Sequence, residues 1–383
     1  MSFNFDQPID RQHSDSQKWQ KYAGRDVLPL WVADTDFAAP PAVTAALRER
    51  VEHEVFGYAK PLPSLNDAVI AHCTQHYGWT IDPSWIVWLP GLVTGLNVAA
   101  AMAGERGDEI LCATPVYPPF MSAPANQGRV AVTVPMVLRN NRWELDLNLL
   151  AQKITPRTRQ LFLCSPHNPV GRAFSRAELE QIGAFCLRHN LVLVSDEIHC
   201  DLILDDIAHI PAATLSPEIA TRTITLMAPS KTYNIAGLGC SFAVISDAKL
   251  RASFNRATQG IVPDINALGL VAGEAALRHG EPWRRALLEY LRGNRDLIEH
   301  AVARGELPGI AMTHVEATYL AWLNIEALKL DNAHAFFEQH GLGFSDGSPF
   351  GAASNSYVRL NFGCTRATLV EALARLQRAL ASR

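Results

Sequence analysis

Short continuous runs of apolar residues alternate with amphipathic stretches through the middle of the chain. Four of the runs have the length of buried strands and cover residues 109–117, 159–169, 191–199 and 222–231. The stretch 175–190 has helical spacing, and Ser175 and Glu178 at its start form a capping box. Because strands that are apolar throughout and separated by helices form parallel βαβ units, the pattern predicts an α/β fold with a mostly parallel sheet.

Polar residues cluster where three of these predicted strands end. Asn168, Asp196 and Lys231 each stand at the end of an apolar run or just after it. Ligands of open α/β sheets bind beyond the carboxyl ends of the strands. We therefore expect an amide, a carboxylate and an amine to face one crevice, although each alone is also compatible with an ordinary strand end. The neighbouring Glu197 is expected to be structural.

A glycine-rich turn earlier in the chain is a candidate phosphate site. Gly91, Thr94 and Gly95 precede a stretch of small residues, 96–103, that we predict to be a helix. Unpaired backbone N–H groups at a helix start are suited to a phosphate. Because most such turns are only turns, this interpretation depends on the other residues.

The composition favours small molecules as binding partners. The 383 residues are 48% apolar and 19% charged with a net charge of −4, so there is no basic footprint for nucleic acid or an anionic membrane. No apolar run is long enough for a membrane span, and no signal peptide is recognisable. The seven cysteines lack CxxC spacing and the histidines lack HExxH spacing, so we predict no disulfide scaffold and no metal site. We expect a cytoplasmic protein with reduced thiols.

The candidate residues together match pyridoxal 5′-phosphate (PLP). A desolvated lysine such as Lys231 can form an imine with this cofactor. A carboxylate such as Asp196 keeps the pyridine nitrogen protonated, so that the ring accepts electrons from the substrate's α-carbon. The sequence therefore predicts a PLP enzyme.

Four segments resemble the successive motifs of fold-type I PLP enzymes of the aspartate aminotransferase superfamily. They are SPHNPVGRAFSRAEL, VSDEIHCDLIL, APSKTYNIAGL and YVRLNFGC. Their order and spacing also agree, with 28 residues from Asn168 to Asp196 and 35 from Asp196 to Lys231. Within that superfamily the chain most resembles the MalY/PatB group of cystathionine β-lyases, or cysteine-S-conjugate β-lyases, through LPLWVADTDFAAPPAV, FGYAKP and TPVYPPF.

The resemblance implies a role for each matching cofactor-site residue. Lys231 would form the Schiff base and, once displaced, act as the base that takes the α-proton. Asp196 would bind the pyridine nitrogen and Asn168 the phenolic oxygen of the ring. Tyr117 would stack on the ring, and His199 lies where many aminotransferases carry a tyrosine near the ring oxygen.

Further residues are implied for the phosphate and the substrate. Val93, Thr94 and Ser230 would bind the phosphate, and Tyr58 would reach the phosphate of the neighbouring subunit. Arg359 would bind the substrate carboxylate bidentately, beside Asn168. Trp31 and Asp34 either line the mouth of the substrate pocket or pack the N-terminal arm. Tyr58 and Tyr117 could instead be core aromatics, and Arg359 a salt-bridge arginine.

Two positions depart from the typical aminotransferase pattern. Ala228 stands where a serine or threonine is usual, and Gly239 where an arginine binds the phosphate. The missing arginine argues against ordinary transamination, whereas the same pattern is expected of the β-lyase group.

The implied architecture is a homodimer with active sites at the subunit boundary. An N-terminal arm that belongs partly to the small domain would cover 1–44, a large PLP-binding domain 45–280, and a smaller α+β domain 281–383. A long helix over 280–303 would link the domains, and 316–325 and 357–363 would be strands of the small one.

The predicted activity is β-elimination from L-cystathionine or a related cysteine S-conjugate, giving a thiol, pyruvate and ammonia. An aminotransferase would use the same residues and transfer the amino group to a 2-oxo acid. A PLP-binding regulator of a protein partner is a weaker alternative, because binding alone would not require Lys231, Asp196 and Arg359 together.

Overall fold

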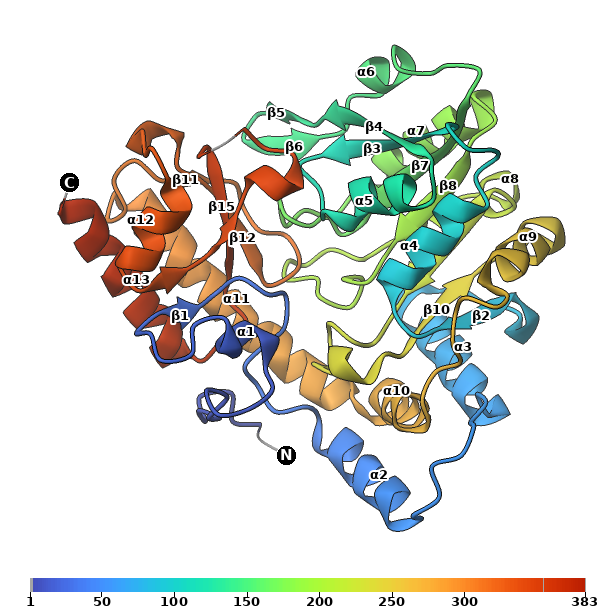
Figure 1. Cartoon of the computed structure of the whole chain (residues 1–383), viewed down its shortest axis with the longest axis horizontal. Helices are drawn as coiled ribbons and strands as arrows, with labels where there is room; N and C mark the ends of the chain where they lie inside the picture. Colours follow the sequence, from blue (N-terminus) through green and yellow to red (C-terminus); the bar gives the residue numbers. More distant parts are fainter. Residues whose placement is uncertain (1–2, 354, 383) are drawn as a thin grey trace.

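Two β-sheets organise the computed structural model, which describes residues 3–353 and 355–382 (Figure 1). Within these residues, seven strands form the large sheet, in the order β2 (Ile86–Leu89), β10 (Ser241–Val244), β9 (Thr223–Met227), β8 (Val192–Asp196), β7 (Thr158–Cys164), β3 (Glu109–Thr114) and β4 (Val130–Pro135). From β9 to β4 neighbouring strands are parallel, whereas β10 runs antiparallel to both of its neighbours. The four strands predicted from the apolar runs are confirmed.

The large sheet is buried on both faces, which explains why its strands are apolar at successive positions. On β7, Leu161 and Leu163 face one hydrophobic cluster, and Phe162 and Cys164 face another. Because successive side chains of a strand point to opposite faces, a strand covered on both sides must be apolar throughout.

Helices cover both faces of the large sheet. One face carries α4 (Leu92–Ala101), α5 (Pro119–Asn126) and α9 (Ala248–Thr258). The other carries α3 (Pro63–Tyr77), α6 (Leu147–Ala151), α7 (Arg176–Arg188) and α8 (Pro217–Ala220). The helices α2 (Pro41–Glu52) and α10 (Ala267–His279) pack against each other. The predicted capping box of α7 is present, with Ser175 and Glu178 bonded to each other's backbone.

The smaller sheet is antiparallel and lies beside the large one. Its order is β11 (Ala311–Met312), β12 (Leu320–Asn324), β15 (Tyr357–Asn361) and β14 (Ser345–Asp346). The helices α11 (Glu281–Ala303), α12 (Ala333–Gln339) and α13 (Arg366–Ala381) pack with it in one cluster. Both predicted strands and the long helix are therefore confirmed.

The N-terminal segment, with α1 (Gln17–Gln20), packs against the C-terminal part of the chain. There β1 (Leu28–Pro29) pairs with β13 (Leu342–Gly343). A short hairpin joins β5 (Val137–Arg139) to β6 (Arg142–Glu144). The domain boundaries at 44 and 280 stay a prediction. Over the described ranges, no helix combines the length and the apolar character that crossing a membrane requires.

The helix predicted over 96–103 begins four residues earlier, at Leu92. The expectation that Thr94 and Gly95 precede the helix was therefore wrong. A Cβ at Gly95 would lie 3.1 Å from side-chain atoms of Leu226 and Leu89, so this glycine permits close packing of α4 on the sheet rather than a turn.

Glu197, directly after β8, fixes the loop that contains His209 and Ala212. Its buried carboxylate accepts hydrogen bonds from the Ser195 hydroxyl at 2.8 Å and the Ala212 backbone N–H at 3.0 Å. Its other oxygen lies 2.7 Å from Nε2 of the buried His209. The loop that carries Ala212 and His209 is thereby joined to the strand that ends at Asp196, which supports a structural role for Glu197.

We predict that Glu197→Ala destabilises the fold by about 2–4 kcal/mol, because three buried groups lose their partner. The measurement is urea unfolding of the cofactor-free protein, followed by circular dichroism. Glu180→Ala, at an exposed glutamate of α7, is the control and should leave the midpoint nearly unchanged. Equal midpoints for the two variants would show that the Glu197 network contributes nothing.

Candidate active site

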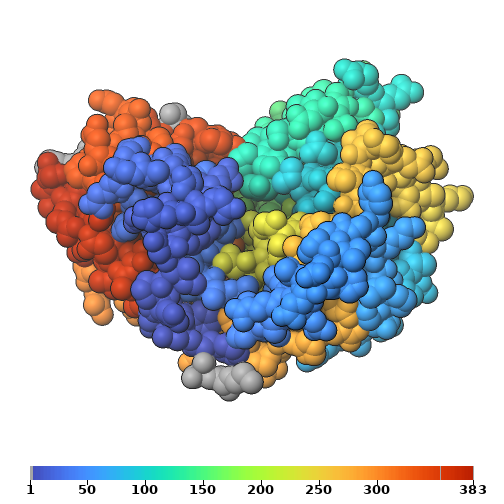
Figure 2. Space-filling view, turned by 60° about the horizontal axis from the view of Figure 1, so that its bottom comes forward, coloured from blue at the N-terminus to red at the C-terminus, as the bar shows by residue number. Residues whose placement is uncertain are grey.

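A cavity of about 1160 Å³ lies between the carboxyl edge of the large sheet and the small sheet. Figure 2 shows its opening as a hollow between the dark blue and red lobe, formed by the N-terminal segment and the small sheet, and the green and cyan lobe of the large sheet. The predicted site residues that line the cavity are Trp31, Asp34, Val93, Thr94, Tyr117, Asn168, Asp196, His199, Ser230, Lys231 and Arg359. Tyr58 does not line it.

The strand order explains how three distant residues meet. Asn168 follows β7, Asp196 is the last residue of β8, and Lys231 follows β9. Since these three strands are parallel neighbours, their carboxyl ends lie at the same edge of the sheet. The predicted convergence of an amide, a carboxylate and an amine is confirmed.

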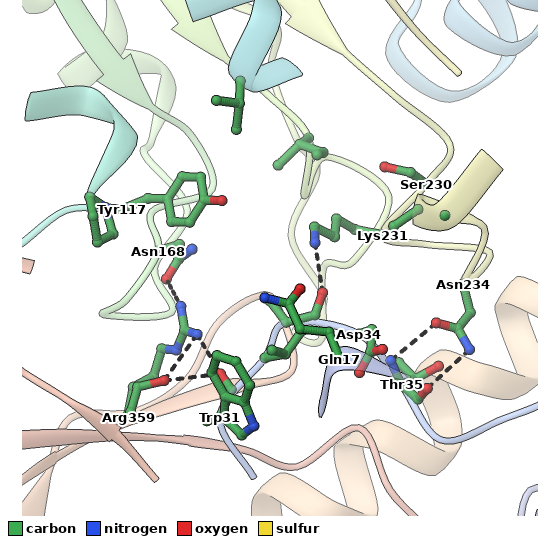
Figure 3. A pocket seen from close by; sticks show the side chains of 18 of the residues that line it. Gln17, Trp31, Asp34, Thr35, Tyr117, Asn168, Ser230, Lys231, Asn234 and Arg359 are labelled. Carbon is green, nitrogen blue, oxygen red and sulfur yellow. Dashed lines mark hydrogen bonds between the residues drawn. The ribbon is translucent and has the colours of Figure 1, made fainter. Parts of the chain in front are cut away.

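The Lys231 amine points into the cavity and donates a hydrogen bond to the Ala33 carbonyl at 2.7 Å (Figure 3). Burial lowers the pKa of this lysine to about 8; the Arg359 charge acts in the same direction, and the Asp34 charge opposes it. The amine is therefore neutral in a useful fraction of molecules near neutral pH, as a nucleophile or base requires.

Asp196 is a buried carboxylate with no ion pair among the described residues. It is 4% exposed and accepts a hydrogen bond from the Ile198 N–H at 3.1 Å. Burial raises its pKa to about 7, an effect that the Lys231 charge partly offsets. A carboxylate in this state favours a cationic N–H group beside it, and a protonated pyridine nitrogen supplies one.

Arg359, on β15, is a buried guanidinium that also lacks a carboxylate partner in the described parts of the chain. It donates to Oδ1 of Asn168 at 2.9 Å, to the Trp31 carbonyl at 2.7 Å and to the Ser345 hydroxyl at 3.3 Å (Figure 3). Its buried Nε has no hydrogen-bond partner among the residues that the structure describes. Burial lowers its pKa to about 10, so a bound anion would stabilise its charge. The salt-bridge alternative for Arg359 is not realised here.

Tyr117 and His199 present a ring and a neutral imidazole to the same space. The Tyr117 N–H donates to the Asn168 carbonyl at 3.1 Å, and burial raises the pKa of its hydroxyl. His199 is 2% exposed, and within residues 3–353 and 355–382 its Nδ1 has no hydrogen-bond partner. Burial and the charges of Lys231 and Arg359 lower its pKa to about 3, so the imidazole is uncharged.

The first turn of α4 and the Lys231 segment form the candidate phosphate end. Val93 and Thr94 belong to that turn, whose N–H groups have no acceptor within the helix, and Ser230 lies beside them in the cavity lining. Gly239 has a φ of 61°, and a Cβ there would lie 2.7 Å from the Pro90 carbonyl oxygen. An arginine therefore does not fit at position 239 in this backbone.

These features fit PLP. An amine of lowered pKa, an unpaired buried carboxylate and a helix start occupy the walls of one cavity, and an unpaired guanidinium faces them. Each corresponds to one part of the cofactor or of an amino-acid substrate: the aldehyde, the pyridine nitrogen, the phosphate and the substrate carboxylate.

The structure adds functional residues that the sequence did not indicate. Asn234 binds the backbone of Thr35 and Phe37, and Asn361 binds the carbonyls of Val32 and Asp34. These contacts fix residues 30–37, which run along the cavity beneath Lys231. The motif containing Trp31 and Asp34 was recognisable in the sequence, but no local pattern marks partners some 200 or 330 positions away.

Tyr58 lies on the exposed loop between α2 and α3, away from the cavity of its own subunit. Its side chain is fully exposed, and Val55, Phe56 and Leu62 on the same loop are each about 60% exposed. A role for Tyr58 therefore requires a second subunit.

Comparisons with known proteins agree with this site. The family model for aminotransferase class I and II matches residues 25–376. Cystathionine beta-lyase PatB of Bacillus subtilis is 38% identical over 98% of this chain and 100% of that protein. Among solved structures, the crystal structure of OvoB is 49% identical in sequence, with a TM-score of 0.96. Cystalysin from Treponema denticola, whose crystal structure contains PLP, is 30% identical, also with a TM-score of 0.96. Both matches cover 100% of this chain and 100% of the other chain.

The resemblance seen in the sequence motifs is thereby confirmed over nearly the whole chain, and its fold-type I expectation with it. This chain belongs to the class I and II aminotransferase family, within the group that includes the PatB-type cystathionine beta-lyases.

Proposed function

We propose that the protein is a PLP-dependent carbon–sulfur β-lyase that cleaves L-cystathionine or a related cysteine S-conjugate. The observation that carries the proposal is one cavity in which the Lys231 amine, the unpaired Asp196 carboxylate and the unpaired Arg359 guanidinium face each other. The name of PatB and the PLP in cystalysin support the same activity and cofactor.

The substrate is held first by its carboxylate. Arg359 would bind it through its guanidinium, whose orientation is fixed by the hydrogen bond to the amide oxygen of Asn168. This places the α-carbon beside Lys231. PLP, when bound, supplies an aldehyde for the substrate amine and a ring that withdraws electrons from the α-carbon. Asp196 would hold the proton on the ring nitrogen.

Lys231 then acts as a base at the α-carbon. Its lowered pKa makes the neutral amine available, and the proton that it takes forms an ammonium group near the Ala33 carbonyl. The β-carbon–sulfur bond breaks and the thiolate leaves with the bonding electrons. The three-carbon product takes up water, so that L-cystathionine and water give homocysteine, pyruvate and ammonia.

The working unit in this proposal is a cytoplasmic homodimer. The exposed apolar loop around Tyr58 supports burial against a second copy, in which Tyr58 would reach the phosphate end of the neighbouring cavity. All seven cysteines are buried free thiols, which supports a reducing compartment.

We expect the PLP-loaded protein to release pyruvate continuously from L-cystathionine without any 2-oxo acid. Lys231→Ala should lower kcat about 10³-fold or more, because it removes both the attachment point and the base. Lys153→Ala, at an exposed lysine, is the control. Turnover that stops after one equivalent and resumes only with a 2-oxo acid would instead establish an aminotransferase.

Arg359→Lys should raise KM for L-cystathionine about 100-fold and change kcat less, because lysine keeps the charge but loses the two parallel N–H donors. Steady-state kinetics measure both constants, and Arg139→Lys at an exposed arginine is the matched control. An unchanged KM in Arg359→Lys would exclude this residue as the carboxylate site.

The shared site can be tested with two inactive variants, Lys231→Ala and Tyr58→Ala. When they are co-expressed with different tags and the hybrid dimer is purified, one of its two sites has both residues intact, so about half of the wild-type activity should return. A hybrid as inactive as its parents would refute the contribution of Tyr58 across the interface.

A further inference from the structure

The amine of Lys231 already has a binding place in the protein when it is not attached to the cofactor. It donates to the Ala33 carbonyl at 2.7 Å, and this carbonyl also accepts a hydrogen bond from the Tyr319 hydroxyl at 3.0 Å. If the proposed function is right, the lysine is released and must return in each turnover. The Ala33 oxygen then determines the position of the free amine until it is attached to the cofactor again.

The backbone on both sides of Ala33 is held by a single side chain. The Asn361 amide nitrogen donates to the Val32 carbonyl at 2.5 Å and to the Asp34 carbonyl at 2.7 Å. Its amide oxygen accepts the Gly363 N–H at 2.7 Å, so the side chain cannot rotate without losing three bonds. Asn361 is completely buried.

Asn361 is also linked to the substrate site through its strand. It lies two residues after Arg359 on β15, and side chains two apart on a strand share a face. The Arg359 guanidinium donates to the Trp31 carbonyl, one residue before Val32. One strand of the small sheet therefore holds the substrate carboxylate and the backbone segment that receives the lysine of the large sheet.

We propose that Asn361 is a positioning residue for Lys231: by fixing the carbonyls of Val32 and Asp34, it aims the Ala33 carbonyl at the lysine amine and so sets the place to which that amine returns. An ordered acceptor favours the ammonium form, because hydrogen bonding to the charged form stabilises it. Loss of Asn361 therefore lowers the pKa of Lys231.

Nearby charged side chains also affect the pKa of the Lys231 amine, and the test leaves all of them unchanged. Asp34 on the N-terminal segment and Asp196 on β8 raise its pKa, while Arg359 on β15 lowers it. The uncharged imidazole of His199 faces the same space. Exchanging Asn361 for another neutral residue alters none of these charges.

The test is pH-dependent acetylation of Lys231 in the cofactor-free protein, with acetic anhydride and mass spectrometry. The variant is Asn361→Ser, whose hydroxyl can still accept from Gly363 but cannot reach both carbonyls. The matched control is Gln160→Ser, because the buried Gln160 side chain also donates to a backbone carbonyl, that of Ala99 in α4, which belongs neither to residues 30–37 nor to the Gly363 segment. Asn361→Thr replaces the serine variant if that does not fold.

We expect the apparent pKa of Lys231 to fall by about 0.5 unit or more in Asn361→Ser and to stay within about 0.2 unit of the wild type in Gln160→Ser. In the PLP-loaded enzyme, kcat should fall about tenfold with KM within about twofold. Identical labelling profiles in the wild type and Asn361→Ser, or equal shifts in Asn361→Ser and Gln160→Ser, would overturn the proposal. Since the labelling uses neither cofactor nor substrate, its result is independent of whether the enzyme eliminates or transaminates.

Discussion

The cost of burying charged groups without partners governs the whole site. Removing an ionised side chain from water is expensive unless an opposite charge or several hydrogen bonds replace the solvent. Lys231, Asp196 and Arg359 are each buried in the cavity wall with their charge incompletely matched, and burial shifts the pKa of all three. The sheets keep the three groups from collapsing onto one another. Binding of an amino acid and a charged cofactor is favourable because their charged groups can pair with these side chains.

Residues 30–37 connect the two sheets at this point. Carbonyls of this segment accept hydrogen bonds from Arg359 and Asn361 of the small sheet. They also accept hydrogen bonds from Lys231 and Asn234, which lie in the loop after β9 of the large sheet. The proposed carboxylate site, Arg359, and the Lys231 amine are therefore held to the same short piece of backbone.

The sequence was sufficient for the elements whose position follows from local pattern. The four apolar strands could be predicted, and the meeting of Asn168, Asp196 and Lys231 followed because parallel strands end at one edge. The start of α4 was predicted wrongly because glycine is the usual residue of a turn, so Gly95 was placed before the helix. In the structure this glycine lies inside the helix and permits close packing on Leu226. Asn361 could not be identified, since its partners lie more than 320 residues earlier and depend on the docking of one sheet against the other.

The left-handed backbone at Gly239 limits how this active site can change. Because the Pro90 carbonyl occupies the space of a side chain at that position, the single substitution Gly239→Arg would not place the arginine of ordinary aminotransferases in this backbone. Its introduction would require the turn around Gly239 and the loop before α4 to be rebuilt together. A laboratory search for a transaminase that varied position 239 alone would therefore meet the backbone clash before it could gain a new phosphate contact.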